Sequence, residues 1–305
     1  MLAVADVVEK SARKLAEELE ISAWGRDYRP LLANGDIQAV AICSSTDTHA
    51  QIIIEAAEAG KHIFCEKPIA LEIDKIDRAL AAVEKAGVKL QIGFNRRFDP
   101  SFQRAKEVVG SGKIGIPQLL RISSRDPQPP PLDYIKASGG LFLDMMIHDF
   151  DMARFLLGEE VTELMATGHC LIDPAIGKCG DIDTAVVLLK FRSGALGTID
   201  NSRQSVYGYD QRIEVFGSKG SVVVENKTPT EVTVHSADSI QSDKPLYFFL
   251  ERYQEAYLAE MKQFIACILE DKKPSVGGLD GRISAAMSYA AMESLNTGTY
   301  VKIKS

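Results

Sequence analysis

An aspartate and a histidine stand four residues apart in an otherwise apolar stretch. Asp144 and His148 are surrounded by Leu, Phe, Met and Ile side chains, and their spacing places both on one face of a helix, with Asp151 one turn farther on. A histidine that titrates near neutral pH can take a proton as a hydride leaves, while a nearby carboxylate binds a hydroxyl or orients the ring. One alternative is a buried His–Asp pair that only supports the fold. Another is a metal site, but two carboxylate oxygens and one imidazole would make a poor zinc site.

Polar residues also follow two apolar runs that are typical of strands. The segment 44–49, Ser-Ser-Thr-Asp-Thr-His, has hydroxyls and turn amides that would either face a cofactor or cap the next helix. Lys67 lies between Glu66 and Pro68 after the next run. Its ammonium would lower the pKa of a substrate hydroxyl and hold the developing alkoxide, or it would be solvated like most surface lysines.

Two further polar segments contain groups that could contact a ligand, the first of them at the carboxyl edge of the predicted parallel sheet. Arg97 lies in an Asn-Arg-Arg-Phe turn after a fourth apolar run, where the alternative is a solvated basic turn. Tyr207 lies in a polar Tyr-Gly-Tyr-Asp loop between two predicted strands. Its hydroxyl would either bind a polyol or fix the loop.

The elements that must position these groups change character near residue 96. Before it, short apolar runs alternate with amphipathic helical patterns, which predicts βαβ units and a parallel sheet covered on both faces. Ligands bind such sheets at the carboxyl edge, where the strand-to-helix turns lie. The predicted strands are Leu2–Ala5, Ala39–Cys43, His62–Cys65 and Leu90–Gly93, and the predicted helices are Val8–Leu19, His49–Ala59 and Ile73–Ala86.

After Pro100 the pattern favours an α+β domain with a mainly antiparallel sheet, because alternating runs are separated by short glycine-containing turns. We therefore predict a Rossmann-type domain at 1–96 and an α+β domain at 97–305. The predicted strands of the second domain are Leu119–Ser124, Val161–His169, Thr184–Phe191, Ala195–Asp200, Arg212–Phe216, Ser221–Val224 and Glu231–His235, and its predicted helices are Ser101–Val109, Gly140–Leu157, Leu250–Glu270 and Gly281–Leu295.

Asp6 follows the first predicted strand with only five residues before it. In a dinucleotide-binding fold, the acid that binds the adenosine ribose lies about 20 residues beyond a glycine-rich turn. If Asp6 has this role, about 30 residues comprising the first strand, the glycine turn and the first helix are missing. A shortened expressed form, a misplaced start codon and a degenerate gene are equally compatible with this. The alternative for Asp6 is a residue that begins a loop or caps a helix.

Composition narrows the class of protein. The net charge of −7 argues against nucleic-acid or anionic-membrane partners. No apolar run is long enough to span a bilayer, and the first ten residues lack the pattern of a secretory signal, so we expect a cytoplasmic protein. The five cysteines have no CxxC spacing, so neither a disulfide framework nor a zinc site is expected.

Together these motifs resemble the family of glucose–fructose oxidoreductases and inositol dehydrogenases. The resemblance covers the chain from Leu2 to its C-terminus and rests on Val-Ala-Asp at 4–6, the segment 44–49, Glu-Lys-Pro at 66–68, the segment 93–99 and the helix with Asp144 and His148. Within the family, segments 139–158 and 202–220 resemble most closely the myo-inositol 2-dehydrogenases.

The resemblance implies roles for individual residues. It implies Lys67, Asp144 and His148 as the catalytic group, with His148 as acid and base. It also implies NAD rather than NADP, because the Asp6 carboxylate would repel a 2′-phosphate. The implied cofactor-binding residues are Asp6, Ser44, Ser45, Thr46, His49, Glu66 and Lys67, and the implied polyol contacts are Arg97, Asp151 and Tyr207.

The implied reaction is the NAD-dependent oxidation of myo-inositol to 2-keto-myo-inositol, a step of myo-inositol catabolism, in a homotetramer that pairs open sheets. Two alternatives stay open. One is a dehydrogenase of another inositol isomer or sugar. The other is a non-catalytic, truncated relative that binds a sugar or a nucleotide.

Overall fold

The computed structural model describes residues 1–303; residues 304 and 305, the last two of the predicted second domain, lie outside the described residues. The chain forms two compact units, one of residues 1–93 with 263–282 and one of residues 94–262 with 283–305. The predicted domain division after residue 96 stays a prediction. Each unit is described in turn.

The first unit contains parallel strands, which confirms the predicted Rossmann-type fold. Strand β1 (Ala3–Ala5) pairs with β2 (Ala23–Gly25), and β3 (Ala39–Ile42) pairs with β4 (His62–Cys65), which pairs with β5 (Leu90–Ile92). The two sheets are separate.

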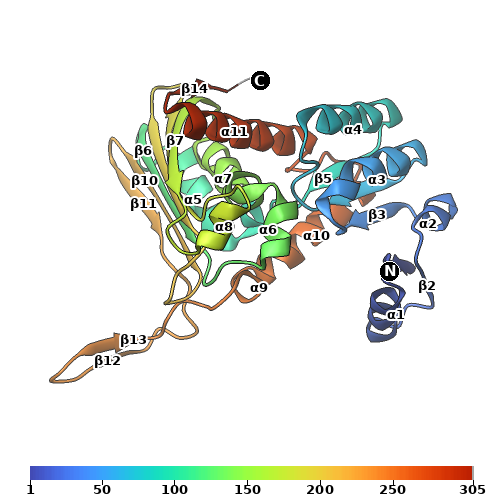
Figure 1. Ribbon diagram of the computed structural model, residues 1–305, viewed down its shortest axis with the longest axis horizontal. Helices are drawn as coiled ribbons and strands as arrows, with labels where there is room; N and C mark the ends of the chain where they lie inside the picture. Colours follow the sequence, from blue (N-terminus) through green and yellow to red (C-terminus); the bar gives the residue numbers. More distant parts are fainter. Residues whose placement is uncertain (304–305) are drawn as a thin grey trace. The chain divides into compact units, whose positions relative to one another are not determined.

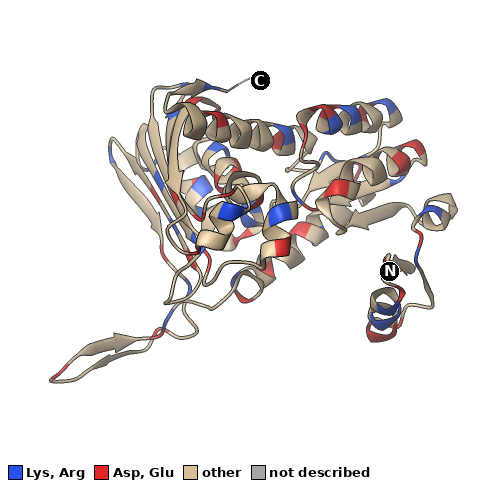
Figure 2. Ribbon diagram, viewed as in Figure 1, with Lys and Arg blue, Asp and Glu red and all other residues tan. Residues whose placement is uncertain are grey.

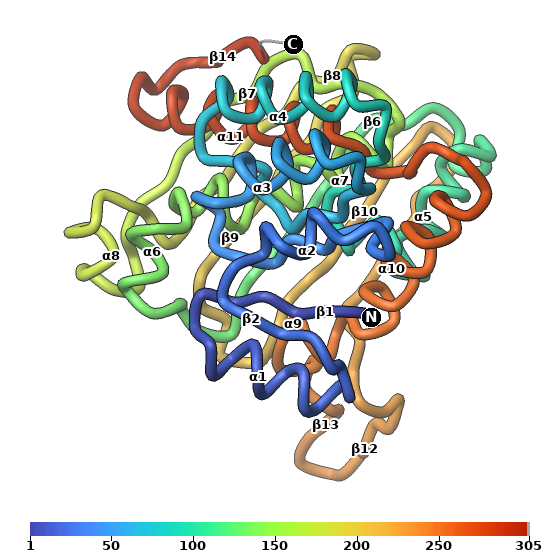
Figure 3. Tube along the Cα trace, turned by 90° about the vertical axis from the view of Figure 1, so that its right-hand side faces the viewer, coloured from blue at the N-terminus to red at the C-terminus, as the bar shows by residue number. Residues whose placement is uncertain are grey.

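Helices connect these strands. Helix α1 (Glu9–Glu18) joins β1 to β2, and α2 (Arg29–Ala33) precedes β3. Helices α3 (Thr46–Glu58) and α4 (Ile73–Ala86) pack side by side (Figures 1 and 3). Helix α4 ends as predicted because Gly87 takes up the left-handed conformation that is typical of a C-terminal cap. Sequence analysis missed β2 and α2, which are too short to show a period.

The later chain contributes to the core of the first unit. Ile63 and Cys65 of β4 are fully buried. Phe64, which points to the opposite face, lies 6.0 Å from Phe264 between ring centroids. Phe264 belongs to α10 (Gln254–Leu269), so this helix packs against the parallel sheet. The carboxyl edge of β3, β4 and β5 therefore rests on a core that is packed on both faces.

The second unit is built on a seven-stranded sheet of mainly antiparallel strands, as predicted. Its order is β11-β10-β6-β9-β8-β7-β14, and only the β6–β9 pair of this sheet is parallel. The strands are β6 (Pro117–Arg125), β7 (Val161–His169), β8 (Thr184–Phe191), β9 (Leu196–Ser202), β10 (Asp210–Gly217), β11 (Gly220–Val224) and β14 (Val301–Lys302).

One face of this sheet is covered and the other is open. In β8, Val187 and Leu189 are buried whereas Val186 and Leu188 are 42% and 41% exposed, as alternation along a strand requires. Figure 1 shows helices on the covered face. They are α5 (Pro100–Gly110), α7 (Ile147–Leu157) and the second half of α11 (Gly278–Thr297). We call the two faces of the sheet the covered face and the open face.

Shorter elements complete the second unit. A 3-10 helix spans Asn95–Phe98, and a π-helical turn spans Phe142–Met146 directly before α7. The predicted helix Leu250–Glu270 is divided, because Tyr253 leaves the helical conformation between two helices. The remaining elements are α6 (Leu132–Ser138), α8 (Pro174–Lys178), α9 (Phe249–Arg252) and the separate hairpin of β12 (Thr233–His235) and β13 (Ile240–Ser242).

Charged side chains are interspersed along the helices (Figure 2). Pairs of opposite charge one turn apart, such as Arg13 with Glu17 and Arg104 with Glu107, lie within hydrogen-bond distance.

Within residues 1–303, no helix combines the length and the apolar character needed to cross a membrane.

Candidate active site

Two glycines open the helix that contains Asp144 and His148. Gly139 and Gly140 have φ angles of +86° and +81°, which side chains other than glycine rarely adopt. A Cβ on Gly140 would lie 2.8 Å from Oδ1 of Asp181. That same oxygen accepts a hydrogen bond from the main-chain N–H of Leu141 at 3.0 Å. The glycine pair thus lets the Asp181 carboxylate approach the beginning of the helix.

Asp144 lies in the π-helical turn, and His148 lies in the first turn of α7. The predicted helix Gly140–Leu157 therefore departs from regular α geometry at Asp144, and π turns occur frequently at functional sites. The imidazole of His148 packs edge-on against Phe94, with 5.9 Å between ring centroids and an interplanar angle of 81°. His148 as a whole is half-buried, so part of the residue stays accessible to a ligand.

Both oxygens of the Asp144 carboxylate accept hydrogen bonds. The hydroxyl of Tyr134 donates to Oδ1 at 2.8 Å, and Nη1 of Arg203 donates to Oδ2 at 3.1 Å. Burial and the negative charge of Asp144 both raise the pKa of Tyr134 above its ordinary value. Tyr134 therefore stays a neutral donor, and the carboxylate is held from two sides.

Two consecutive arginines of the 3-10 helix bind two aspartates of α7. Arg96 Nη1 lies 2.5 Å from Asp149 Oδ1. Arg97 binds Asp151 through both Nε and Nη2, at 2.8 and 2.5 Å. The structure thus brings together Arg97 and Asp151, two of the three residues expected to bind a polyol. Arg97 is 11% exposed and Asp151 is 1% exposed, so the guanidinium is the more accessible partner.

The Arg96–Asp149 pair is buried under the covered face of the sheet. The Arg96 side chain is 6% exposed and the Asp149 side chain is fully buried. Asn201 donates to Asp149 Oδ2 at 2.9 Å, and Arg96 donates to the Ser124 hydroxyl at 3.2 Å. Burial raises the pKa of Asp149, and the charge of Arg96 counteracts this effect. For Arg96, the alternative of a solvated basic turn is wrong, because its ion pair with Asp149 of α7 lies in the core.

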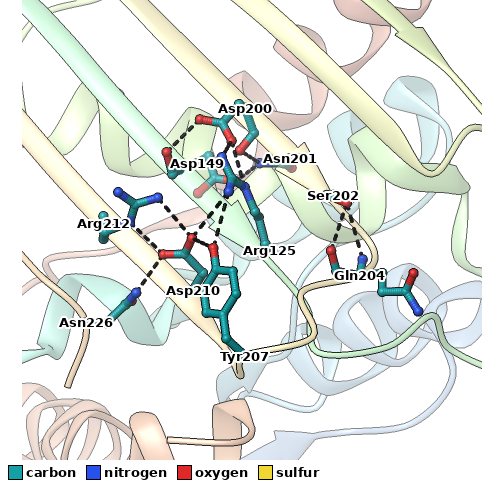
Figure 4. Close-up of polar contacts among 11 residues, drawn as sticks. Arg125, Asp149, Asp200, Asn201, Ser202, Gln204, Tyr207, Asp210, Arg212 and Asn226 are labelled. Atoms are coloured by element: carbon teal, nitrogen blue, oxygen red, sulfur yellow. Dashed lines mark hydrogen bonds and ion pairs between the residues drawn. The ribbon is translucent and has the colours of Figure 1, made fainter. Parts of the chain in front are cut away.

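Tyr207 belongs to a separate polar cluster at one end of the open face (Figure 4). Its hydroxyl hydrogen-bonds with the Asp210 carboxylate, and Arg125 donates to that hydroxyl at 3.3 Å. Arg125 also binds Asp200, and Arg212 binds Asp210 at 2.7 Å. The structure joins Tyr207 to these four residues, and no hydrogen bond recorded for it reaches Asp144 or His148 among residues 1–303.

In the first unit, the predicted cofactor-binding residues lie where parallel strands end. Asp6 follows β1, and its Oδ1 accepts the main-chain N–H of Val8 at 2.7 Å. Ser44 and Ser45 are exposed after β3. Ser45 is the N-cap of α3, which begins at Thr46, three residues before the predicted start, and no side chain caps its first turn. An exposed acid, two exposed hydroxyls and an uncapped helix N-terminus fit a dinucleotide.

His49 joins two of these turns. Its side chain is buried. Nδ1 lies 2.8 Å from the carbonyl oxygen of Pro68, and Nε2 lies 2.9 Å from that of Ser44. Both ring nitrogens thus face the main chain. This geometry supports a role for His49 in holding the turn after Lys67 close to the turn after β3.

Glu66 and Lys67 follow β4 in the first unit, whereas Asp144 and His148 belong to the second unit. The peptide bond between Lys67 and Pro68 is cis. Burial raises the pKa of Glu66, and the charge and main-chain N–H of Lys67 counteract this. A Cβ on Gly93 would lie 2.8 Å from Oε2 of Glu66, so the glycine after β5 leaves room for this carboxyl.

A glycine pattern elsewhere does not serve a dinucleotide. Residues 110–115 match G-x-G-x-x-G in letters, but they join the end of helix α5 to strand β6. The fingerprint requires the opposite order, strand before helix, so that a helix N-terminus meets the pyrophosphate. Across residues 1–303, no group of three or more His, Cys, Asp and Glu side chains could hold a metal ion.

Sequence analysis missed three residues of the site. Tyr134 and Arg203 contact Asp144 from positions 10 and 59 residues away in the chain, and Asp181 contacts Leu141 from 40 residues away. Tyr134 lies three residues after the proline-rich stretch 126–131, whose composition predicts a stiff, extended connection. No local pattern marks Arg203 or Asp181.

Comparisons with known proteins agree with this arrangement. Residues 1–94 match the family described as "Oxidoreductase family, NAD-binding Rossmann fold", and residues 102–223 match the "GFO/IDH/MocA C-terminal domain". The chain is 50% identical to a myo-inositol 2-dehydrogenase of Thermotoga maritima, over 100% of this chain and 91% of the relative. It is 39% identical to a scyllo-inositol 2-dehydrogenase (NAD(+)) of Bacillus subtilis, over 99% and 88%.

A solved structure supports the same assignment. The crystal structure of a probable dehydrogenase from Thermotoga maritima superposes with a TM-score of 0.98 at 50% identity, covering 99% of this chain and 91% of that one. Both sequence domains and the whole fold are thus shared with known oxidoreductases. The chain belongs to the GFO/IDH/MocA family of NAD-dependent oxidoreductases, which act on CH–OH groups.

Proposed function

We propose that the chain oxidises the axial hydroxyl of myo-inositol to 2-keto-myo-inositol, in the catabolic direction. The names of the relatives support an inositol substrate. The observation that carries the proposal is the fixed Asp144 carboxylate on the same helix as a partly exposed His148. A donor on each oxygen gives Asp144 a defined orientation, and acid–base catalysis requires groups held in place.

In the proposed reaction, His148 takes the proton of the hydroxyl that is oxidised. The Lys67 ammonium stabilises the negative charge that develops on that oxygen. Asp144 accepts a hydrogen bond from the polyol or orients the imidazole. NAD, when bound, supplies the hydride acceptor. The C–H electron pair therefore leaves as hydride while the O–H proton stays on His148, which balances the oxidation.

The remaining predicted residues bind and orient. We propose that Arg97, Asp151 and Tyr207 contact the polyol hydroxyls, with the Arg97 guanidinium as the accessible part of its ion pair. Asp6 would bind the adenosine ribose and exclude a 2′-phosphate. Ser44, Ser45, Thr46, His49, Glu66 and Lys67 would form the cofactor side of the site.

The test is NADH formation by the purified chain with NAD and either myo-inositol or scyllo-inositol. A second form, extended at the N-terminus by a strand, a glycine-rich turn and a helix, is assayed beside it. We expect at least one form to turn over, with a higher kcat/KM for myo-inositol than for scyllo-inositol. Turnover by neither form would contradict the proposal.

A second candidate is oxidation of scyllo-inositol, which the Bacillus subtilis relative supports by its name. A higher kcat/KM for scyllo-inositol in the same assay would favour it. A non-catalytic sugar- or nucleotide-binding role is the third possibility. Binding of myo-inositol or NAD without turnover in either form would favour that role.

We also propose a homotetramer that pairs open faces. Contiguous exposed apolar side chains often mark a protein interface. On the open face Leu196, Leu119 and Phe216 are neighbours across three strands and are 50%, 38% and 43% exposed. We expect light scattering to give four times the mass of the chain. A monomer that persists at assay concentration would contradict this.

A cytoplasmic location accompanies the proposed reaction. None of the five cysteines, all within the described residues, is joined in a disulfide, as is usual in a reducing compartment.

A further inference from the structure

A buried arginine connects Asp144 to the chain before strand β8. The Arg203 side chain is 1% exposed. Its Nη1 lies 3.1 Å from Oδ2 of Asp144, and its Nη2 lies 3.5 Å from Oδ2 of Asp181. The two carboxylates are 11% and 12% exposed, so this cation offsets part of the cost of burying their charge.

The main chain of Arg203 is itself held in place. Its N–H donates to the carbonyl oxygen of Asp183 at 2.8 Å. The Asp183 carboxylate accepts the main-chain N–H groups of Leu171, Ile172 and Asp173 at 2.8, 2.8 and 3.1 Å. Burial raises the pKa of Asp183, but these hydrogen bonds outweigh it and keep the pKa below its ordinary value. Arg203 thus projects from a fixed support.

The contacts of Arg203 limit the motion of Asp144. A rotation of the Asp144 carboxylate that separates its Oδ2 from Nη1 of Arg203 would also break the hydrogen bond from Tyr134 to its Oδ1. Asp181 restricts the other side of Arg203 and also receives the N–H of Leu141 at the start of the helix. The guanidinium therefore links the orientation of Asp144 to the position of the helix that contains His148.

We propose that Arg203 is a positioning residue for polyol oxidation, which holds the Asp144 carboxylate in its orientation and offsets its negative charge without itself touching the substrate. This inference rests on the proposed function of Asp144. The burial of the Arg203 side chain prevents contact with a ligand, and its planar guanidinium can bind two carboxylates at once.

The test compares Arg203→Met and Arg203→Lys in the enzyme form that turns over. We expect Arg203→Met to lower kcat/KM for myo-inositol about ten- to a hundredfold, because small displacements of a reacting group cost this much. The acidic limb of the pH dependence of kcat/KM should move to higher pH in this variant, since a carboxylate that loses a neighbouring cation binds a proton more readily. NADH binding, measured by fluorescence, should stay unchanged.

The lysine variant separates charge from geometry. Lysine retains the cation, so the acidic limb should stay near that of the unchanged protein. Its compact ammonium cannot serve both carboxylates as a guanidinium does, so kcat/KM should still fall several-fold. If Arg203→Met does not fold, Arg203→Lys decides: a kcat/KM equal to that of the unchanged protein overturns the proposal.

Arg252→Met is the matched control, because Arg252 forms a similarly buried ion pair with Asp99, with both side chains 4% exposed. It should lower thermal stability without moving the acidic limb. If Arg203→Met shows the same acidic limb as this control, Arg203 has only a structural role and the proposal fails.

An Asp144→Asn variant separates this proposal from the proposed function. If Asp144→Asn loses activity while Arg203→Met has the kcat/KM and pH profile of the unchanged protein, only the positioning role is wrong. If Asp144→Asn is fully active, the role of Asp144 in the proposed function is wrong, and the positioning role fails with it.

Discussion

Replacing His148 with alanine is expected to lower the turnover of myo-inositol about a hundredfold or more, while NAD binding stays close to that of the unchanged protein. The imidazole is the proposed proton acceptor, and alanine offers no group that replaces it. NAD binding should persist because the predicted cofactor-binding residues belong to the first unit and His148 to the second. Steady-state NADH formation and a fluorescence titration with NADH measure the two effects separately.

His169→Ala is the control for the loss of a histidine, because His169 is exposed at the end of β7. Its turnover should match that of the unchanged protein. Unchanged turnover in His148→Ala would remove His148 from the proposed mechanism. Loss of both turnover and NADH binding would point instead to a misfolded protein, which circular dichroism would reveal.

Asp149→Ala is expected to lower the free energy of unfolding by about 3–5 kcal/mol. Arg96 would lose its buried carboxylate partner at 2.5 Å and would remain a cation in the core. Its other hydrogen-bond partners, the Ser124 hydroxyl at 3.2 Å and the Tyr209 hydroxyl at 3.5 Å, are neutral groups. Chemical denaturation followed by circular dichroism gives the difference between the two proteins.

Asp133→Ala is the matched control, since the Asp133 side chain is 96% exposed and pairs with Lys136 on the surface. It should change the free energy of unfolding by no more than about 0.5 kcal/mol. The double variant Arg96→Met with Asp149→Leu should recover part of the loss, because it leaves no buried charge. A loss below about 1 kcal/mol in Asp149→Ala would show that water or a rearrangement compensates Arg96.

Local sequence patterns predicted the longer elements well. Strands Val161–His169 and Thr184–Phe191 have the predicted bounds, because alternation with one buried face fixes both the period and the register. Helix Ile73–Ala86 also has its predicted bounds, since an amphipathic pattern ends at a glycine that can adopt positive φ. Elements without a period, such as β2, α2 and α8, were missed because nothing in a short segment distinguishes them from a loop.

The sequence by itself determined the fold class, the family and the residues whose side chains could take part in the reaction, because residue type and short-range spacing carry that information. Only the tertiary structure decided their partners. Arg96 and Arg97 pair with aspartates 53 and 54 residues away, and Arg203 reaches Asp144 across 59 residues. No local period encodes such distances. They follow from how the 3-10 helix, α7 and the end of β9 pack in three dimensions, and burial then makes each pairing necessary.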